Sequence, residues 1–270
     1  MGQWNDQRLA LLSHFVIQAM PVQKTPAIVI RIHPLGEYDR IVTFYTAHFG
    51  KVRAVGRGAR RPRSRLGGSL ELLNHGTLVY FERPNKDLHV INDFDVTTAF
   101  DGIKADFERT SYACYLAELV NAIEPSESVN QSVFQLLKSS FEGLAQVDDV
   151  PLFTRAFELH LLELAGFAPQ LTHCVDCRKP IPNVPKAVFS SNLGGLLCAD
   201  CADRDARAVT ISRGSCELMK QLQKSDFDRL HRFRASTLNH RELKRVLVEF
   251  ISYHTERSLK SLAFIEEVGV

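Results

Sequence analysis

The chain has no long hydrophobic run. No apolar stretch in its 270 residues reaches the roughly 18 residues that a membrane-spanning helix needs, so the sequence predicts a protein without membrane spans. The most apolar N-terminal segment, residues 9–20, follows Asp6, has Arg8 as the only basic residue before it, and is interrupted by polar residues. We interpret this segment as a short amphipathic helix and not as a signal peptide, and we expect a cytoplasmic protein.

Signatures of the common catalytic sites are also missing. The sequence contains no G-x4-G-K-[ST] phosphate loop, no H-E-x-x-H zinc motif and no G-x-S-x-G nucleophile turn. The carboxylate pairs Asp148-Asp149 and Glu266-Glu267 are adjacent in sequence and resemble solvated surface groups. With 45% hydrophobic and 24% charged residues the chain is an ordinary globular protein, and we expect a binding protein and not an enzyme.

Cysteines are too sparse for a scaffold held together by disulfides, because only six are present. Four of them are clustered in two C-x2-C pairs separated by 20 residues: Cys174, Cys177, Cys198 and Cys201. Two residues between thiolates let one tight turn direct both sulfurs at the same ion, and two such turns supply the four ligands of a tetrahedral zinc site. The spacing therefore predicts structural Zn²⁺. The remaining cysteines, Cys114 and Cys216, lie on helical patterns and are interpreted as core residues.

Two alternatives to zinc stay open from spacing alone, namely a pair of disulfides or an empty site. A catalytic metal is disfavoured because four thiolates close the coordination shell and leave no position for water. The segment between the pairs predicts a hairpin that returns the second pair to the first, with its turn at Asn192, Gly194 and Gly195.

Charge is unevenly distributed along the chain. The net charge is +2, but residues 1–100 carry 13 Lys/Arg against 8 Asp/Glu, whereas the rest of the chain is slightly acidic. The excess lies in residues 51–65 (KVRAVGRGARRPRSR), which contain seven basic residues and no acid: Lys51, Arg53, Arg57, Arg60, Arg61, Arg63 and Arg65. This pattern predicts a local surface for a polyanion.

The position of these residues favours contact with a phosphate backbone. Lys51, Arg53 and Arg57 project from one face if residues 51–57 form a strand, and the other arginines then lie on a flexible loop at its end. Arginine also offers a planar fork for phosphates and for stacking on bases. A solvated charge run without function is the alternative. Five aromatic residues nearby are candidates for base stacking, although most are expected in the core: Phe44, Tyr45, Phe49, Tyr80 and Phe81.

The hydrophobic pattern predicts two structural regions. Five short β-branched runs separated by Gly, Pro and Asn predict a small antiparallel barrel over residues 25–99, after an N-terminal extension at residues 1–24. The expected strands are 27–33, 40–46, 51–57, 76–83 and 88–94. Residues 100–270 then predict a helical domain in which residues 167–210 form the inserted zinc-binding element. We therefore expect an α+β fold with more than one domain.

The helices of the second region are expected at 101–123, 128–145 and 151–165, and they resume near Ser212. The last long helix is expected to begin at Asn239, with its side chain as the cap and Glu242 reaching back to it.

With these features the sequence resembles the RecO family of bacterial recombination mediators. The resemblance is carried by AIVIRIHPLGEYDRIVTFYTAHFGKVRAV (27–55), GRGARRPRSRLGGSLELL (56–73), FSSNLGGLLCADC (189–201) and the tail helix YHTERSLKSLAFI (253–265). It covers residues 24–265. The extension at residues 1–22 departs from the family pattern.

The resemblance implies an N-terminal OB-fold, a helical domain and a zinc-binding element. It further implies a role in DNA repair and recombination through the RecF pathway, at the nucleoid. The expected activities are binding of single- and double-stranded DNA and annealing of complementary strands. The expected partners are RecR and the acidic, apolar C-terminal tail of single-strand DNA-binding protein, with RecA loaded onto the coated strand. By position, the seven basic residues of 51–65 become the DNA-facing residues.

Two other functions stay open from the residues themselves. A zinc-ribbon regulatory factor would bind nucleic acid with sequence preference through base edges. A metal-dependent nuclease would need an open metal site and would cleave strands when Mg²⁺ or Mn²⁺ is added.

Overall fold

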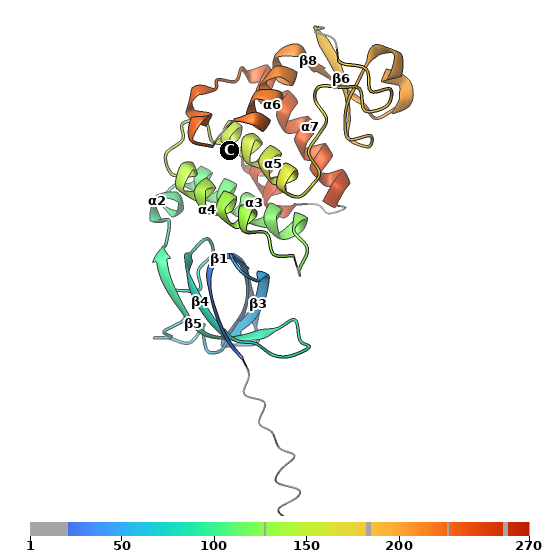
Figure 1. Cartoon of the computed structure of the whole chain (residues 1–270). Coiled ribbons are helices and arrows are strands. Elements are labelled where there is room, and N and C mark those ends of the chain that lie inside the picture. The colour runs from blue at the N-terminus through green and yellow to red at the C-terminus, as the bar shows by residue number, and fades with distance from the viewer. Residues whose placement is uncertain (1–20, 127, 182–184, 226, 256–258, 270) are drawn as a thin grey trace, which may run out of the picture.

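The N-terminal part of the protein is a closed five-stranded barrel. The computed structural model describes residues 21–126, 128–181, 185–225, 227–255 and 259–269. Neighbouring strands follow the order β1-β2-β3-β5-β4, and all pairs are antiparallel except β3 with β5 (Figure 1). The predicted barrel of the OB type is confirmed. Its strands are β1 (Val22–Leu35), β2 (Asp39–Thr46), β3 (Gly50–Gly56), β4 (His75–Phe81) and β5 (His89–Thr98).

The barrel closes around residues that alternate along the strands. In β4, for example, Leu78 and Tyr80 are buried while their neighbours are partly exposed. Strand β1 begins at Val22, earlier than expected, because residues 22–24 pair with residues 79–81 of β4 and close the barrel. These three residues thus belong to the barrel and not to the extension, of which residues 1–20 lie outside the described part of the chain.

Helices follow the barrel, and three of them begin at a side-chain cap. The carboxylates of Asp106 and Asp149 and the amide oxygen of Asn130 accept the N–H groups that the first turns leave unpaired. Because Asp106 is extended and caps a new helix, the single helix expected at residues 101–123 is in fact two. The helices are α2 (Asp101–Lys104), α3 (Phe107–Ile123), α4 (Gln131–Leu144) and α5 (Val150–Leu164).

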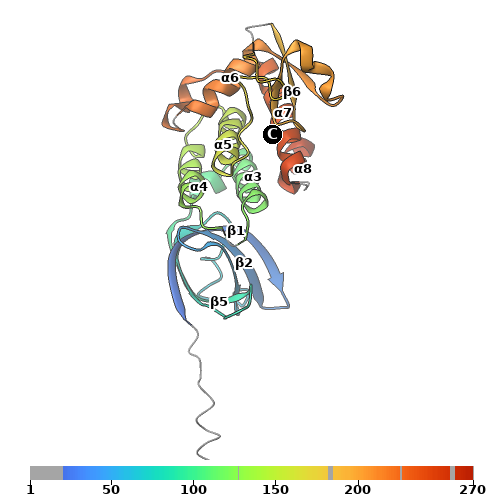
Figure 2. The ribbon, with the colours of Figure 1, turned by 45° about the vertical axis from the view of Figure 1, so that its right-hand side comes forward.

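A small three-stranded sheet and the C-terminal helices complete the molecule (Figure 2). The sheet has the order β7-β6-β8 and packs on α6 and α7. None of the described helices is long and apolar enough to cross a membrane. The elements are β6 (Lys186–Ser190), β7 (Gly195–Leu197), the short helix η1 (Ala199–Arg204), β8 (Val209–Ser212), α6 (Arg213–Lys224), η2 (Phe227–Arg232), α7 (Thr237–Thr255) and α8 (Lys260–Val268).

The start of the last long helix differs from the prediction. Helix α7 begins at Thr237, and Ser236 and Asn239 form the reciprocal cap, with Ser236 Oγ accepting from Asn239 N and Asn239 Oδ1 accepting from Ser236 N. Glu242 instead accepts hydrogen bonds from the N–H and hydroxyl of Ser212, at the start of α6. The reciprocal cap expected for Asn239 and Glu242 is thus formed by Ser236 and Asn239, three residues earlier. Glu242 does not take part, because its carboxylate is bound by Ser212. The segment 253–265, which was predicted as one tail helix, instead contains the end of one helix, α7, and the start of another, α8.

The barrel is joined to the helices by a packed interface. Ile28, Ile30 and Tyr45 point out of the barrel into the core of the helical part. Tyr45 is fully buried, and its hydroxyl donates to Glu124 Oε2 at 3.0 Å. Gly50 has φ +60° and lies against the backbone of Ser128, so that a Cβ there would come within 2.1 Å of the Ser128 carbonyl oxygen. Only glycine fits this approach.

Candidate nucleic-acid interface and metal centre

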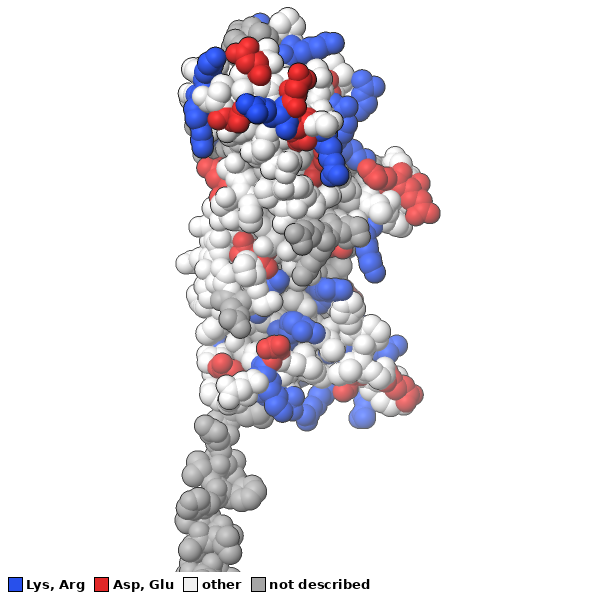
Figure 3. All heavy atoms as spheres, turned by 90° about the vertical axis from the view of Figure 1, so that its right-hand side faces the viewer, with Lys and Arg blue, Asp and Glu red and all other residues white. Residues whose placement is uncertain are grey.

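The basic stretch, residues 51–65, covers strand β3 and the turns that follow it. All six of its arginines are exposed: Arg53, Arg57, Arg60, Arg61, Arg63 and Arg65. Figure 3 shows, on one face of the molecule, Lys and Arg side chains on the barrel and others at the opposite end. The only ion pair among these arginines and the described residues joins Arg65 to Asp93 at 3.6 Å. Most of this charge therefore faces solvent and is available to a polyanion.

The arginine turns, residues 57–65, contact the β1–β2 hairpin through Gly58, Arg60 and Arg61, where the sequence predicted a flexible loop. The Arg60 N–H donates to Tyr38 O at 2.8 Å, and its guanidinium donates to Gly36 O at 3.1 Å. The Asp39 carboxylate accepts from the Gly58 N–H at 2.7 Å. The Arg61 guanidinium lies 5.0 Å from the centre of the Tyr38 ring. Such contacts order the loop before any ligand binds, which lowers the entropy cost of binding.

The first three basic residues do not share one environment. Lys51 and Arg53 lie on the outer face of β3, as strand alternation predicts, and Arg57 follows the end of the strand. Lys51, however, turns toward the helical part, where its ammonium group donates to Asn121 O at 2.9 Å. Its charge helps to join the two parts of the molecule, whereas Arg53 remains exposed.

Most of the nearby aromatic side chains are core residues. Phe44 and Tyr45 are fully buried and Tyr80 is 3% exposed, whereas Phe49 is 37% exposed at the β2–β3 turn. The sequence reading missed Tyr38, which is 42% exposed beside Arg61. Its position between two strands carries no periodic signal, and only the docking of the arginine turns on the hairpin brings it into the basic surface.

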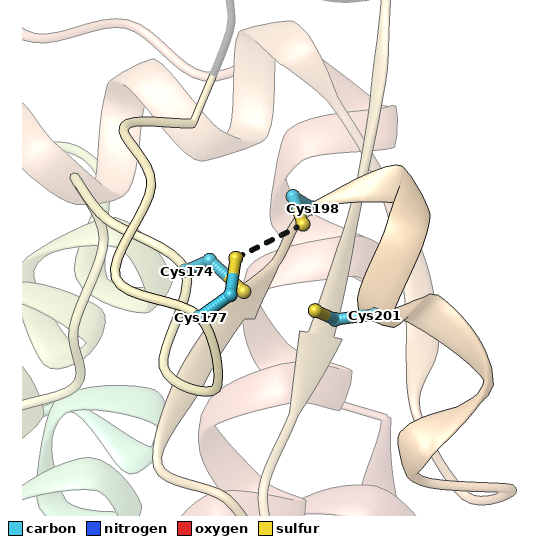
Figure 4. A group of neighbouring side chains, drawn as sticks. All are labelled: Cys174, Cys177, Cys198 and Cys201. Carbon is cyan, nitrogen blue, oxygen red and sulfur yellow. Dashed lines mark hydrogen bonds between the residues drawn. The ribbon is translucent and has the colours of Figure 1, made fainter.

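The four clustered cysteines come together at one point (Figure 4). Their sulfur atoms all lie within 4.8 Å of one another, and Cys177 Sγ is 3.5 Å from Cys198 Sγ. A tetrahedral site with Zn–S bonds of about 2.3 Å would place its sulfurs about 3.8 Å apart. Cys174, Cys198 and Cys201 are buried and Cys177 is exposed. The residues present therefore fit a four-thiolate metal site.

Local structure explains how each pair of cysteines converges. The turn at Cys174 is closed by a hydrogen bond from Arg178 N to Cys174 O, and Arg178 takes the positive φ of +64° that this turn requires. Cys198 directly follows β7, and Cys201 lies in η1, where its N–H donates to Cys198 O. The adjacent His173 is not part of the group that the structure brings together.

The hairpin expected between the two pairs is also confirmed, with β6 and β7 antiparallel. Gly194 and Gly195 have φ values of +91° and +156°, and a Cβ at Gly195 would come within 2.2 Å of Gln170 O. Asn192 does not adopt a positive φ, and its amide oxygen instead accepts from the Tyr253 hydroxyl at 2.6 Å.

Backbone N–H groups prepare one of the thiols for metal binding. Burial raises the pKa of Cys174, but the N–H groups of Cys177, Cys198 and Asp176 outweigh burial and lower the pKa to about 6. The thiolate is the form that binds metals, so this sulfur is ready to act as a ligand at neutral pH.

The helical part contains a buried ion pair that the sequence did not reveal. Arg155 and Glu158 on α5 are 2.8 Å apart, and the Tyr115 hydroxyl donates to the same carboxylate at 2.5 Å. Arg155 also lines a pocket of about 440 Å³ together with His240, Arg241 and Lys244. Its Nη1 is buried and has no hydrogen-bond partner among the described residues. Asp149, which pairs with His240 at 3.2 Å, also lines the pocket, and Lys244 pairs with Glu266 at 3.2 Å. Three cations against one acid still give the pocket lining a positive charge.

Comparison with known proteins agrees with this architecture. The family described as "Recombination protein O N terminal" matches residues 20–100, and that described as "Recombination protein O C terminal" matches residues 104–263.

Relatives named "DNA repair protein RecO" cover nearly the whole chain. The protein of Symbiobacterium thermophilum is 36% identical over 250 residues, which are 92% of this chain and 98% of the relative. The relative from Roseiflexus sp. is 34% identical over 92% of this chain and 86% of its own length. That of Pelotomaculum thermopropionicum is 32% identical over 93% of this chain and 96% of its own length. The chain therefore belongs to the RecO family of DNA repair proteins.

Proposed function

We propose that this protein is a recombination mediator that binds single- and double-stranded DNA and anneals complementary strands. In this proposal it acts with RecR to load RecA onto strands coated by single-strand DNA-binding protein, at the nucleoid and without catalysis of its own. The observation that carries the proposal is the set of six exposed arginines, held in place on an OB-type barrel, in a chain of the RecO family.

The arginine surface accounts for annealing through charge. Two DNA strands repel one another through their phosphates, and a cationic surface that neutralises both lowers the barrier to pairing. Contacts of this kind carry no sequence information, so binding is expected to be similar for unrelated sequences. The DNA-facing residues in this proposal are the six arginines, with Lys51 contributing from the barrel–helix junction.

For the cysteine cluster we propose structural zinc. Four thiolates complete a tetrahedral shell, so a bound ion would stabilise the turns of residues 174–201 and leave no position for a reacting water. The loop is held by the metal, and the DNA-binding surface lies elsewhere, on the barrel.

The cationic pocket of the helical part is the proposed site for the tail of single-strand DNA-binding protein. Arg241 and the Nη1 of Arg155, which has no partner among the described residues, would pair with acidic side chains and the terminal carboxylate, and Lys244 would join them by exchanging its pairing with Glu266. The pocket would also take an apolar side chain.

Timed annealing of two complementary oligonucleotides tests the proposal. Complementary strands, bare or coated with single-strand DNA-binding protein, are expected to pair faster with the protein than without it. R60A/R61A should lose much of this acceleration. K186A/K224A removes two exposed lysines from the end of the molecule far from the barrel and should retain it.

Three results would contradict the proposal. Equal pairing rates with and without protein would remove the mediator function. Strong preference for one sequence would favour the zinc-ribbon regulator instead. Cleaved strands after addition of Mg²⁺ or Mn²⁺ would favour a nuclease.

A further inference from the structure

Two neighbouring cavities lie along strand β1, one beside the arginine turns and one at the junction with the helices, and we call the two together the groove. Its upper part is a cavity of about 610 Å³ between β1, α3 and the start of α8, lined by Arg31, Leu72 and Lys260 among others. Its lower part is a cavity of about 360 Å³ beside Arg40 and Arg60. Leu72 lines both cavities, so the two are neighbours on this face.

The groove has an excess of positive charge. Arg31, Lys260, Arg40 and Arg60 line it, against two acidic residues. Both acids are already engaged: Glu71 pairs with Lys104 at 3.4 Å, and Glu118 accepts the N–H groups of Lys260 and Ser261 at the start of α8. The four cations of the groove therefore outnumber its two carboxylates, and both carboxylates already have other partners.

Strand register adds a fifth cation at the same place. Arg31 on β1 pairs with Thr43 on β2, and Thr43 pairs with Arg53 on β3, so the two arginines lie in one row across the outer face of the sheet. Both are exposed, and neither forms an ion pair with a described residue. Arg31 also lines one cavity together with Lys260. The pKa of His33, on the same face, is lowered by burial and then by Arg31, Arg53 and Lys260, which agrees with this placement.

The figures show that the elements that carry these cations lie on one side of the molecule. Helix α8 lies on the same side as the hairpin end of β1 and β2 (Figure 2). Figure 3 shows that the surface there is hollowed between barrel and helices, with Lys and Arg side chains around the hollow.

We propose that this groove is a second nucleic-acid subsite, in which a single strand continues from the arginine turns along β1 to Arg31 and Lys260. The inference rests on the proposed function and extends the DNA site from the barrel to the helical domain. Cavities of this size take one or two nucleotides of a single strand. Cavities of about 610 and 360 Å³ are too small to enclose a double helix. Arg31 and Lys260 contact phosphates there, and Arg53 lies between them and the arginine turns.

The test compares R31A/K260A with the charge-matched control K186A/K224A, in the full-length protein and with oligothymidylates of increasing length. Each phosphate contact on a single strand contributes a slope of about −0.7 in a plot of log affinity against log salt, so the double variant should make the slope less negative by about 1.4. At 0.1 M salt the same contribution corresponds to about a 25-fold loss of affinity. The control should bind like the wild type.

Length dependence separates this subsite from the arginine turns. Oligothymidylates just long enough for the turns should bind R31A/K260A and the wild type equally, and the difference should appear only with longer strands. R31K/K260R keeps both charges and should restore the slope, which also excludes a folding defect as the cause.

The outcomes are distinguishable from failure of the proposed function. If the wild type binds oligothymidylate and R31A/K260A matches K186A/K224A at every length, the groove is not a subsite, although the DNA-binding function stands. A wild type that binds no polynucleotide would overturn both.

Discussion

Removal of one hydroxyl group should weaken the connection between the barrel and the helices. The Tyr45 hydroxyl donates to Glu124 Oε2 at 3.0 Å and lies 3.3 Å from Asn130 O, in an interface where Tyr45 is fully buried. Tyr45→Phe keeps the ring and its packing and deletes only these hydrogen bonds.

The magnitude follows from the burial of the carboxylate that loses its donor. Glu124 is 4% exposed, so water cannot replace the hydroxyl. A hydrogen bond to a charged group contributes about 1.5–3 kcal/mol, and we expect the variant to lose about 2 kcal/mol of unfolding free energy. For a chain of this size the loss corresponds to a decrease of about 4–8 °C in the melting temperature.

The loss should depend on pH. Burial raises the pKa of Glu124, while the Tyr45 hydrogen bond and Lys51 partly oppose that rise. A carboxyl whose pKa is higher in the folded state favours folding at low pH and loses that contribution as pH rises through the folded pKa. Without the hydroxyl the pKa rises further, so Tyr45→Phe should destabilise the protein more at neutral pH than in acid, where the carboxyl is protonated in both proteins.

Urea unfolding of the wild type, Tyr45→Phe, Glu124→Gln and the double variant measures the coupling. We expect a coupling energy above about 1 kcal/mol, because the two groups share one buried contact. Additive losses in the double variant, or a Tyr45→Phe loss below about 0.5 kcal/mol, would refute this account of the interface. A loss that is the same at acid and neutral pH would refute the role given to the charge of Glu124.

Three further predictions concern the other sites. Replacing both Arg60 and Arg61 by alanine should make the salt slope of single-strand binding less negative by about 1.4 for every sequence tested, and an unchanged slope would show that these side chains do not contact phosphates. Cys174→Ser, or removal of metal by a chelator, should melt the cysteine-bearing element and lower thermal stability with less effect on DNA binding; purified protein without one equivalent of bound metal would contradict it. Arg155→Ala should cost about 3–5 kcal/mol in urea unfolding because it leaves Glu158 buried without its cation, whereas R155M/E158L should cost much less, and equal losses would argue against an uncompensated charge.

Local patterns were sufficient for much of the architecture. Alternating β-branched runs predicted the barrel because a strand places every second residue in the core. The two C-x2-C pairs predicted a metal site because a two-residue spacing lets one turn direct both sulfurs at one ion. The cap at Asn239 was misplaced because Ser236 offers an equivalent cap three residues earlier, and Glu242 is engaged by Ser212, far away in the sequence.

The sequence alone determined the basic stretch, the spacing of the four thiols and the order of strands and helices. Only the tertiary structure decided which of these groups meet. Lys51 donates to Asn121 O, and the arginine turns contact the hairpin beside Tyr38. Arg31 and Lys260, more than two hundred residues apart in the chain, line the same cavity. Contacts of this kind depend on how the barrel packs against the helices, and no local periodicity encodes a distance between residues so far apart in the chain.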